Sequence, residues 1–536
     1  MIRPRSGVPA RRLVGAVVAA LVLVPAAAHA GVVDQSAGGA VEIEIGDGTF
    51  SPKDAVIAPG TMVRWTNVSE ERHSVTPDAG SQFGIVTLEP GESYEFTFED
   101  AGTFGYFCSF HGAPGTGEFG TVRVTGRATE TEGTDVSASG TGTTIRVPQD
   151  VPTIQRAVDR STPGSLVLVA PGVYEESVVV GPKHPDIVIR GVDRDRTVLD
   201  GRFDTEPGSE SGIKVLADGV AIENMTARNY VGNGFVWIGA NGYRGSYLTA
   251  VRNGEYGLYA FDSVHGQFDH SYASGSADAG FYIGRCDPCD ALIVDSEAEW
   301  NGLGYSGTNA GGDVVLARSR WHDNRVGIAP NTGPSDRPPP DSGTTIVGNR
   351  VHDNFNAAAP AVELAATMFG DGILLAGSSG NVVDRNLVTG HPRFGIGVVP
   401  LPGPVGQPAF DARDNTVRDN VLFANGFGLA SFATFDDALD PGDNCFSGNA
   451  AGPFAPENLQ LVLSCDGAGV GYVAPLELLA SVFLSSAPPL VDFRTVALPD
   501  PPSGEGMPRP RAARPRPATN EPSTRIRLAK LTVPTG

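Results

Sequence analysis

The feature that most limits the fold of this chain is a glycine followed by an apolar residue, which recurs at nearly constant spacing. The pair begins at Gly234, Gly257, Gly280, Gly304 and Gly327, with separations of 23, 23, 24 and 23 residues, and again at Gly372, Gly395 and Gly428. A repeat of this length, made of short β-branched or aromatic runs between Gly, Asn and Asp corners, is typical of a solenoid whose coils must stack to bury their inner faces. The 45-residue interval after Gly327 predicts two coils, and the 33-residue interval after Gly395 predicts one coil with a proline-rich insertion.

Asparagine follows the expected strand in several repeats, at Asn224, Asn349, Asn386 and Asn420. Amides that hydrogen bond along the stack of coils explain these residues without a catalytic role. Residues 144–445 resemble the pectate-lyase-like superfamily, and more closely its periplasmic, carbohydrate-binding and copper-processing relatives. The resemblance implies a right-handed parallel β-helix, which opens with a short helix after Pro152.

The repeat decays after Cys445, and residues 446–498 predict a carboxy-terminal cap, because an uncovered last coil would invite strand addition from another molecule. Residues 499–536 are rich in Pro and Arg. They predict a disordered tail that folds back on an acidic domain or touches an anionic cell wall.

A second group of residues, upstream of the repeat, predicts a metal site. Cys108 ends an aromatic strand, His111 and Glu118 follow on a Gly/Pro-rich loop, and His73 lies 35 residues before Cys108. One thiolate and two imidazoles with a weak fourth ligand describe a type 1, or blue, copper site. The sequence therefore predicts one copper ion held by Cys108, His73 and His111.

The residues around these ligands resemble the plastocyanin-like cupredoxin family. The stretch Thr49-Phe-Ser-Pro52 and the stretch Val63-Arg-Trp-Thr-Asn67 are similar to the family's approach to its first histidine. The resemblance implies a β-sandwich over residues 31–126, an all-β chain overall, and electron transfer or copper handling as the function.

The chain departs from the cupredoxin pattern at the axial position, where the family usually supplies methionine. No methionine lies between Met62 and Met225, and the residue at the end of the loop is Glu118. A carboxylate is a harder ligand that favours Cu(II), so ligation by Glu118 predicts a lower reduction potential. The alternative is a solvated Glu118 and a three-coordinate site.

The first thirty residues combine four arginines, an apolar run and an Ala-rich segment, which predicts a cleaved signal peptide and an exported protein without a transmembrane anchor. In an oxidising compartment, Cys286 with Cys289 and Cys445 with Cys465 predict two disulfides. A redox or zinc motif at Cys286 is the alternative, but it lacks a second cysteine pair. The small, polar residues 127–143 predict a flexible linker.

The net charge of −22 is concentrated in part in residues 31–126, which contain 14 acidic and 4 basic residues. Such a surface argues against nucleic acid as a partner. It would attract a basic redox protein, and salt would weaken that attraction.

Two similar segments, Trp321-His-Asp-Asn324 and Val351-His-Asp-Asn354, are the best candidates for catalysis in the β-helix. On successive coils, Asp323 and His322 would lie about 4.8 Å from Asp353 and His352. Two carboxylates at that distance suit acid–base chemistry, and the insertions at 330–342 and 357–369 could wall a groove. The alternative is a structural role at the corners of the coils, since Asp and Asn accept a left-handed backbone conformation.

Three hypotheses follow. The first is an exported, non-catalytic copper protein whose β-helix binds carbohydrate or a protein partner. The second is a polysaccharide-active lyase, hydrolase or epimerase with an ancillary copper domain. The third is a structural or adhesive surface protein. The sequence does not decide whether the chain is an enzyme.

Overall fold

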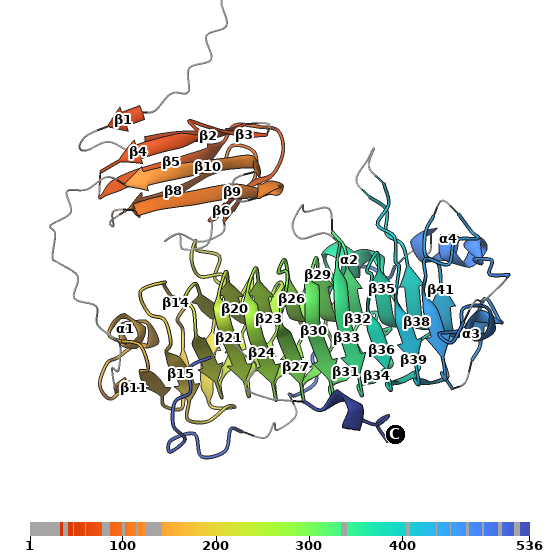
Figure 1. The fold of residues 1–536 in the computed structure, drawn as a ribbon. Coiled ribbons are helices and arrows are strands. Elements are labelled where there is room, and N and C mark those ends of the chain that lie inside the picture. The colour runs from red at the N-terminus through yellow and green to blue at the C-terminus, as the bar shows by residue number, and fades with distance from the viewer. Residues whose placement is uncertain are drawn as a thin grey trace, which may run out of the picture.

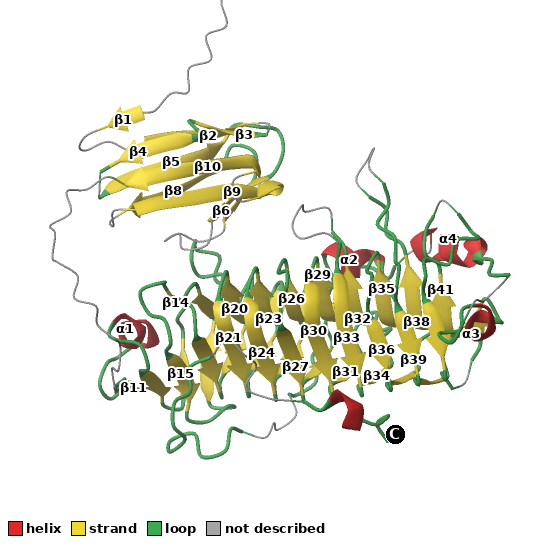
Figure 2. Ribbon diagram, in the orientation of Figure 1, coloured by secondary structure: helices red, strands yellow, loops and turns green. Residues whose placement is uncertain are grey.

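The computed structural model describes residues 33–35, 41–46, 48–58, 60–77, 86–98, 102–113, 116–124, 142–333, 340–403, 408–435, 437–450, 452–467, 471–484, 487–501, 506–518 and 526–535. The predicted signal peptide and all but the last two residues of the predicted linker lie outside these ranges. The chain is all-β, with a small β-sandwich followed by a long stack of parallel strands (Figures 1 and 2).

The sandwich has two sheets. One has the strand order β3 (Thr49–Ser51), β2 (Val41–Gly46), β5 (Thr61–Asn67), β8 (Ser93–Phe98). The other has the order β1 (Val33–Gln35), β4 (Asp54–Ile57), β10 (Thr116–Val124), β9 (Gly102–Ala113), β6 (His73–Pro77), β7 (Val86–Leu88). Alternate residues of β2 and β5 are buried, as expected for strands with one face on a core. Trp65 and Tyr106 from opposite sheets meet edge to face in that core.

The second body is a parallel β-helix with three sheets. The first sheet contains β11 (Thr144–Val147), β12 (Leu166–Val169), β15 (Val188–Gly191), β18 (Val220–Glu223), β21 (Asn241–Ser246), β24 (Val264–Asp269), β27 (Ala291–Val294), β30 (Gly311–Ala317), β33 (Ser342–Val347), β36 (Val382–Asp384), β39 (Thr416–Arg418) and β42 (Cys445–Ser447). The second contains β13 (Gly172–Tyr174), β16 (Thr197–Asp200), β19 (Thr226–Arg228), β22 (Thr249–Val251), β25 (Tyr272–Ser274), β28 (Glu297–Glu299), β31 (Arg320–His322), β34 (Arg350–His352), β37 (Leu387–Thr389) and β40 (Val421–Phe423). The third contains β14 (Val178–Val180), β17 (Ile213–Val215), β20 (Phe235–Ile238), β23 (Tyr256–Phe261), β26 (Ala279–Gly284), β29 (Leu303–Thr308), β32 (Val326–Asn331), β35 (Asp371–Ala376), β38 (Phe394–Val399), β41 (Phe427–Ser431) and β43 (Phe454–Ala455).

The repeated glycine lies at the start of the strands of the third sheet, against the backbone of the next coil. A Cβ at Gly257 would lie 2.6 Å from the carbonyl oxygen of Gly280, and one at Gly327 would lie 2.4 Å from that of Gly372. No side chain fits in that space. The apolar residue that follows each glycine points inward and stacks in register on its neighbours, as Leu258 does on Phe281.

The prediction of two coils between Gly327 and Gly372 is wrong. Ile328 pairs directly with Ile373, so the interval is a single coil. It is lengthened by an insertion after β32 and by another, between β34 and β35, that carries α2 (Glu363–Thr367). Insertions at corners lengthen a coil without adding strands. The 33-residue interval after Gly395 is one coil with an insertion, as predicted, since β38 pairs with β41.

Stacked amides line the corners of the β-helix. The Asn349 backbone N–H and side-chain amide donate to Asn386 Oδ1 at 2.9 and 3.0 Å, and Asn386 makes the same two bonds to Asn420. Asn224 was predicted in the same ladder and is not part of it. It lies at the corner itself with φ 58°, and its side chain donates to the Gly191 carbonyl.

Both ends of the β-helix are covered. At the amino end, α1 (Ile154–Asp159) is capped by Thr153 and buries Ile154, Ala157 and Val158. At the other end, α3 (Leu459–Val462) and α4 (Leu476–Leu484) follow the last coil, which the Cys445–Cys465 disulfide ties down. The structure also joins Cys286 to Cys289. Among the described helices, none is both long and apolar enough to cross a membrane.

The prediction of a disordered tail is wrong for its described residues, 499–501, 506–518 and 526–535. The described residues from 487 onward lie along the β-helix, and they include the 3-10 helix η1 (Leu528–Lys530), below the coils in Figure 1. Arginines of the β-helix hold it through its backbone carbonyls. Arg190 donates to Ala513 at 2.7 Å, Arg252 to Val496 at 2.8 Å, and Arg385 to Leu531 at 2.7 Å. These bonds need no apolar side chains in the tail, which is why its composition does not indicate order.

Candidate metal centre

Three strands of one sheet bring the predicted ligands together. His73 is the first residue of β6, β9 carries Cys108 and His111, and β10 carries Glu118. The pairing of β9 and β10 shifts register between Gly117 and Phe119. Such a bulge re-aims one side chain, here Glu118, which points into the sandwich.

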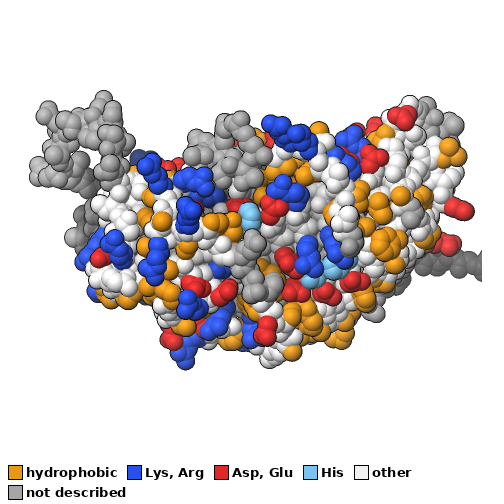
Figure 3. Space-filling view, turned by 90° about the horizontal axis from the view of Figure 1, so that it is seen from below, with side chains coloured by type: hydrophobic (Ala, Val, Ile, Leu, Met, Phe, Trp, Pro, Cys, Tyr) orange, Lys and Arg blue, Asp and Glu red, His pale blue; other side chains and the backbone are white. Residues whose placement is uncertain are grey.

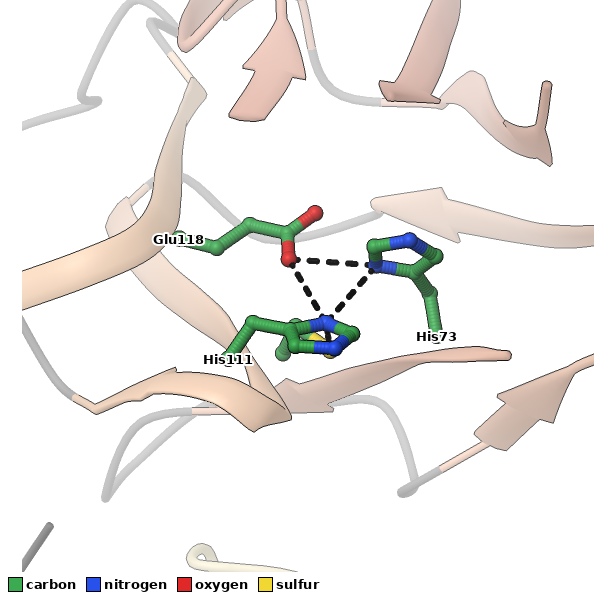
Figure 4. Close-up of side chains that lie close together, drawn as sticks. His73, His111 and Glu118 are labelled. Atoms are coloured by element: carbon green, nitrogen blue, oxygen red, sulfur yellow. Dashed lines mark hydrogen bonds and ion pairs between the residues drawn. The ribbon is translucent and has the colours of Figure 1, made fainter. Parts of the chain in front are cut away.

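The four side chains converge on one point. Glu118 Oε2 lies 3.1 Å from His73 Nδ1 and 3.3 Å from His111 Nδ1, and the two Nδ1 atoms are 3.3 Å apart (Figure 4). Cys108 Sγ is 3.5 Å from His111 Nδ1, and one donor atom from each of the four residues lies within 4.8 Å of all the others.

This spacing fits a bound metal. Ligands held about 2.0–2.3 Å from a first-row metal in a tetrahedral set lie roughly 3.3–3.8 Å from one another. The donor types, one thiolate, two imidazoles and one carboxylate, also suit copper. The sequence left open whether Glu118 binds the metal or faces solvent. The structure places its carboxylate beside both imidazoles and away from solvent.

Burial isolates three of the four ligands from water. Cys108, His73 and Glu118 are at most 1% exposed, whereas the side chain of His111 is 32% exposed. Burial raises the pKa of the Cys108 thiol, and the hydrogen bond from the Ser74 N–H, 3.3 Å from Sγ, opposes this effect. A cation at the centre would favour the thiolate further.

Two polar residues that the sequence analysis did not single out as functional hold the ligand strands in place. The Asn67 side chain donates to the carbonyls of Glu71 and Leu88 and so fixes the loop that leads to His73. Ser74 Oγ lies 2.9 Å from Ser109 Oγ and accepts from the Ser109 N–H, which ties β6 to β9 beside Cys108. Asn67 ends the stretch that resembles the cupredoxin family, and this position could have indicated its role. No sequence pattern indicates the role of Ser74.

The catalytic candidates of the β-helix lie on successive coils, as predicted. His322 pairs with His352 in register, and their rings stack 4.7 Å apart. Each aspartate bonds its own histidine and not the other aspartate, with Nδ1 to carboxylate distances of 2.8 Å for Asp323 and 3.0 Å for Asp353.

The pKa values of the two histidines shift in opposite directions. Burial by itself would lower the pKa of His322, but hydrogen bonds to Asp323 and Glu297 outweigh it and raise the pKa to about 9. Burial lowers the pKa of His352, and the charge of His322 acts in the same direction. Glu299 also lies near His322 and Asp323, yet both ring nitrogens of His322 already face carboxylates. This arrangement fits an imidazolium better than a metal ligand.

These histidines belong to the second sheet, on the side away from the copper domain, where Figure 3 shows histidine among acidic and basic side chains. A cleft lies instead over the third sheet. Its walls include the two insertions that were predicted to form a groove, through Thr332 and Gly333 and through Val362, Leu364 and Met368. The structure therefore does not bring the catalytic candidates into the cleft.

Two family models match the chain. Residues 37–125 match copper binding proteins of the plastocyanin/azurin family, and residues 233–399 match the right handed beta helix region. The plastocyanin of Scenedesmus fuscus is 35% identical over 85 residues, which are 14% of this chain and 85% of that protein. The chloroplastic plastocyanin of Tetradesmus obliquus is also 35% identical over 85 residues, again 14% of this chain, but the chain spans only 57% of its length.

Solved structures resemble each body separately. A purple cupredoxin from Nitrosopumilus maritimus shares 31% identity over 16% of this chain and 99% of its own, with a TM-score of 0.14. The A-module of a mannuronan C-5 epimerase from Azotobacter vinelandii shares 14% identity over 55% of this chain and 90% of its own, with a TM-score of 0.41.

Proposed function

Because its amino-terminal domain belongs to the plastocyanin/azurin family of copper-binding proteins, we propose that this chain is an exported copper protein with one type 1 site. That site passes single electrons or holds copper for transfer, and the β-helix binds carbohydrate or a protein partner. The observation that carries the proposal is the convergence of Cys108, His73, His111 and Glu118 within 4.8 Å.

When bound, copper supplies a one-electron couple between Cu(II) and Cu(I). Cys108, His73 and Glu118 exclude water because they are buried. The partly exposed ring of His111 offers a route from the site to the surface. The bonds of Ser74 and Asn67 hold the strands and the loop that carry the donor atoms, which would limit the rearrangement that an electron transfer requires.

The charge of the copper domain supports a basic redox protein as partner. Long-range attraction to an acidic domain raises the rate of association, and that rate falls as salt screens the charges. Export is supported by the amino-terminal sequence and by the two disulfides, since such bonds persist in oxidising compartments.

The proposal is tested by adding Cu(II) to the purified protein and recording metal content and the visible spectrum. We expect one copper per chain and an intense thiolate-to-copper charge-transfer band. Cys108→Ser removes the sulfur while keeping a similar volume, so the band should vanish. A band that survives in this variant, or a protein that binds no copper, would contradict the proposal.

A second candidate function is a polysaccharide-active enzyme, which one observation favours. The stacked rings belong to His322, whose pKa is raised, and His352, whose pKa is lowered, and such a pair suits a proton donor beside a proton acceptor. Turnover of a uronic-acid polymer that is lost in Asp323→Ala or Asp353→Ala would support this function. Turnover that survives in both variants would remove the pair from consideration.

A further inference from the structure

The described residues from 487 onward, here called the strap, pack on the outer face of the first sheet of the β-helix. Most of the strap lies below the coils in Figure 1, whereas the copper domain lies above them. In β15, Ile189 faces the core, so Val188 and Arg190 on either side of it face outward. Both are nonetheless 0% exposed, and carbonyl groups of the strap accept from the Arg190 guanidinium. The strap therefore covers side chains that would otherwise meet water.

Polar bonds hold the strap along its length. Arginine side chains of the β-helix donate to strap carbonyls, and backbone N–H groups of the strap donate to the β-helix. These bonds include those of Arg190 to Pro510 and Ala513, Arg244 to Arg516, Arg252 to Val496, Arg325 to Pro488, Arg385 to Leu528 and Leu531, Met507 to Asn224, and Ala518 to Gly219. Their partners lie on or next to coils that begin with β15, β18, β21, β30 and β36.

Apolar side chains of the strap add contacts at the corners of the coils. Val496 is 4% exposed and Ala518 is 6% exposed. A Cβ at Gly275, which has φ 77°, would lie 2.5 Å from Leu498 Cδ1, so Leu498 occupies the space next to that glycine. Val496 and Ala518 are the only buried residues of the described strap. A segment with so small a core of its own is ordered by the coils on which it lies.

The β-helix without the strap is close to a one-dimensional structure. In each of its three sheets, a strand pairs only with the strands of the coils before and after it. A coil near one end can then open without disturbing coils far from it, and long stacks of this kind lose cooperativity. The strap differs from the sheets, because it contacts coils that are not neighbours in any of them.

We propose that the strap couples the coils from β15 to β36, so that they open together and not one after another. The coil of β15 opens fully only when the strap releases Arg190, and a released strap withdraws its bonds from the other coils that order it. Arg190 and Ala513 are 323 residues apart. The coils therefore become coupled only when the carboxy-terminal end of the chain is in place, whether or not copper is bound.

The test is native-state hydrogen exchange of the full chain in moderate urea, resolved along the sequence by mass spectrometry. The perturbing variant combines Val496→Asp, Leu498→Asp and Ala518→Asp. The matched control combines Leu490→Asp, Ala512→Asp and Ala529→Asp, all at exposed positions of the strap.

In the wild type we expect the amides of β15 and β30 to exchange with the same dependence on urea, because they open in one step. In the perturbing variant, the amides of β15 should exchange at least tenfold faster and lose that shared dependence. None of the substituted residues bonds to β15, so this change would report coupling along the strap. The control variant should exchange as the wild type does.

Three results would overturn the coupling. Exchange in β15 that stays at the wild-type rate would show that the strap is a passenger. Faster exchange confined to the coils of β18, β21 and β24, next to the substituted residues, would show local support only. Equally faster exchange in β5 of the copper domain would show general destabilisation. If the perturbing variant does not fold, Val496→Asp alone carries the same prediction for β15, with Leu490→Asp as its control.

Discussion

Replacement of Glu118 by glutamine removes one negative charge from the copper site and keeps the shape of the side chain. Glu118 is 1% exposed, and its Oε2 lies 3.1 and 3.3 Å from the Nδ1 atoms of His73 and His111. A buried carboxylate at this distance stabilises Cu(II) more than Cu(I), because Cu(II) carries one more positive charge. Glu118→Gln should therefore raise the reduction potential.

The size of the shift follows from Coulomb's law. At a separation of about 3 Å between the carboxylate and the metal and an effective dielectric constant of about 20, one unit of charge changes the energy difference between the two oxidation states by about 5 kcal/mol. For a one-electron couple this corresponds to about 0.2 V. The amide of the introduced glutamine replaces part of the lost interaction, so we expect the reduction potential to rise by about 0.1–0.2 V.

The assay is a spectroscopic redox titration of the visible band in both proteins. Glu71→Gln is the control, because Glu71 lies 3.5 Å from Nε2 of the same His111 but its side chain is 72% exposed. Water screens that charge, and its removal should move the potential by less than about 0.05 V. A potential in Glu118→Gln that equals the wild-type value, or that changes no more than in Glu71→Gln, would refute a direct role of the carboxylate.

Three further predictions concern the β-helix. Asn386→Ala leaves the Asn349 amide groups and the Ile346 carbonyl without their buried partner. It should lower the free energy of unfolding, measured by urea denaturation, by about 3–6 kcal/mol, whereas Asn241→Ala at an exposed position should change it little. The pKa of His322 is raised on folding, so its stabilising effect is complete below about pH 6.5 and disappears as the pH rises through about 9. The difference in free energy of unfolding between wild type and His322→Gln should therefore fall by up to about 3 kcal/mol over that window. A difference independent of pH would contradict the ion pairs. Arg385→Ala removes the bonds to the carbonyls of Leu528 and Leu531, so amides of residues 526–535 should exchange hydrogen at least tenfold faster, and unchanged protection would show that other contacts hold the tail.

Local chemistry explains why much of this protein follows from its sequence. The repeated glycine reflects one steric requirement, since a Cβ at Gly257 or Gly327 would collide with the next coil, and a similar close contact recurs at the repeated glycines from Gly234 to Gly395. The ladder of Asn349, Asn386 and Asn420 is periodic for the same reason. The Cys108 and His111 pair is recognisable because the two donors lie three residues apart on one strand, β9, and come within 3.5 Å of each other.

Contacts between residues distant in the chain account for what the sequence did not reveal. Whether Glu118 faces solvent or His73 depends on a register shift against β9, and the number of coils after Gly327 depends on which strand pairs with β35. The described part of the tail is held by arginines more than 140 residues away in the chain. A one-dimensional pattern records the conformational preference of a segment. Which side chains face each other across the folded molecule depends on packing, and that packing forms the copper centre and the cleft.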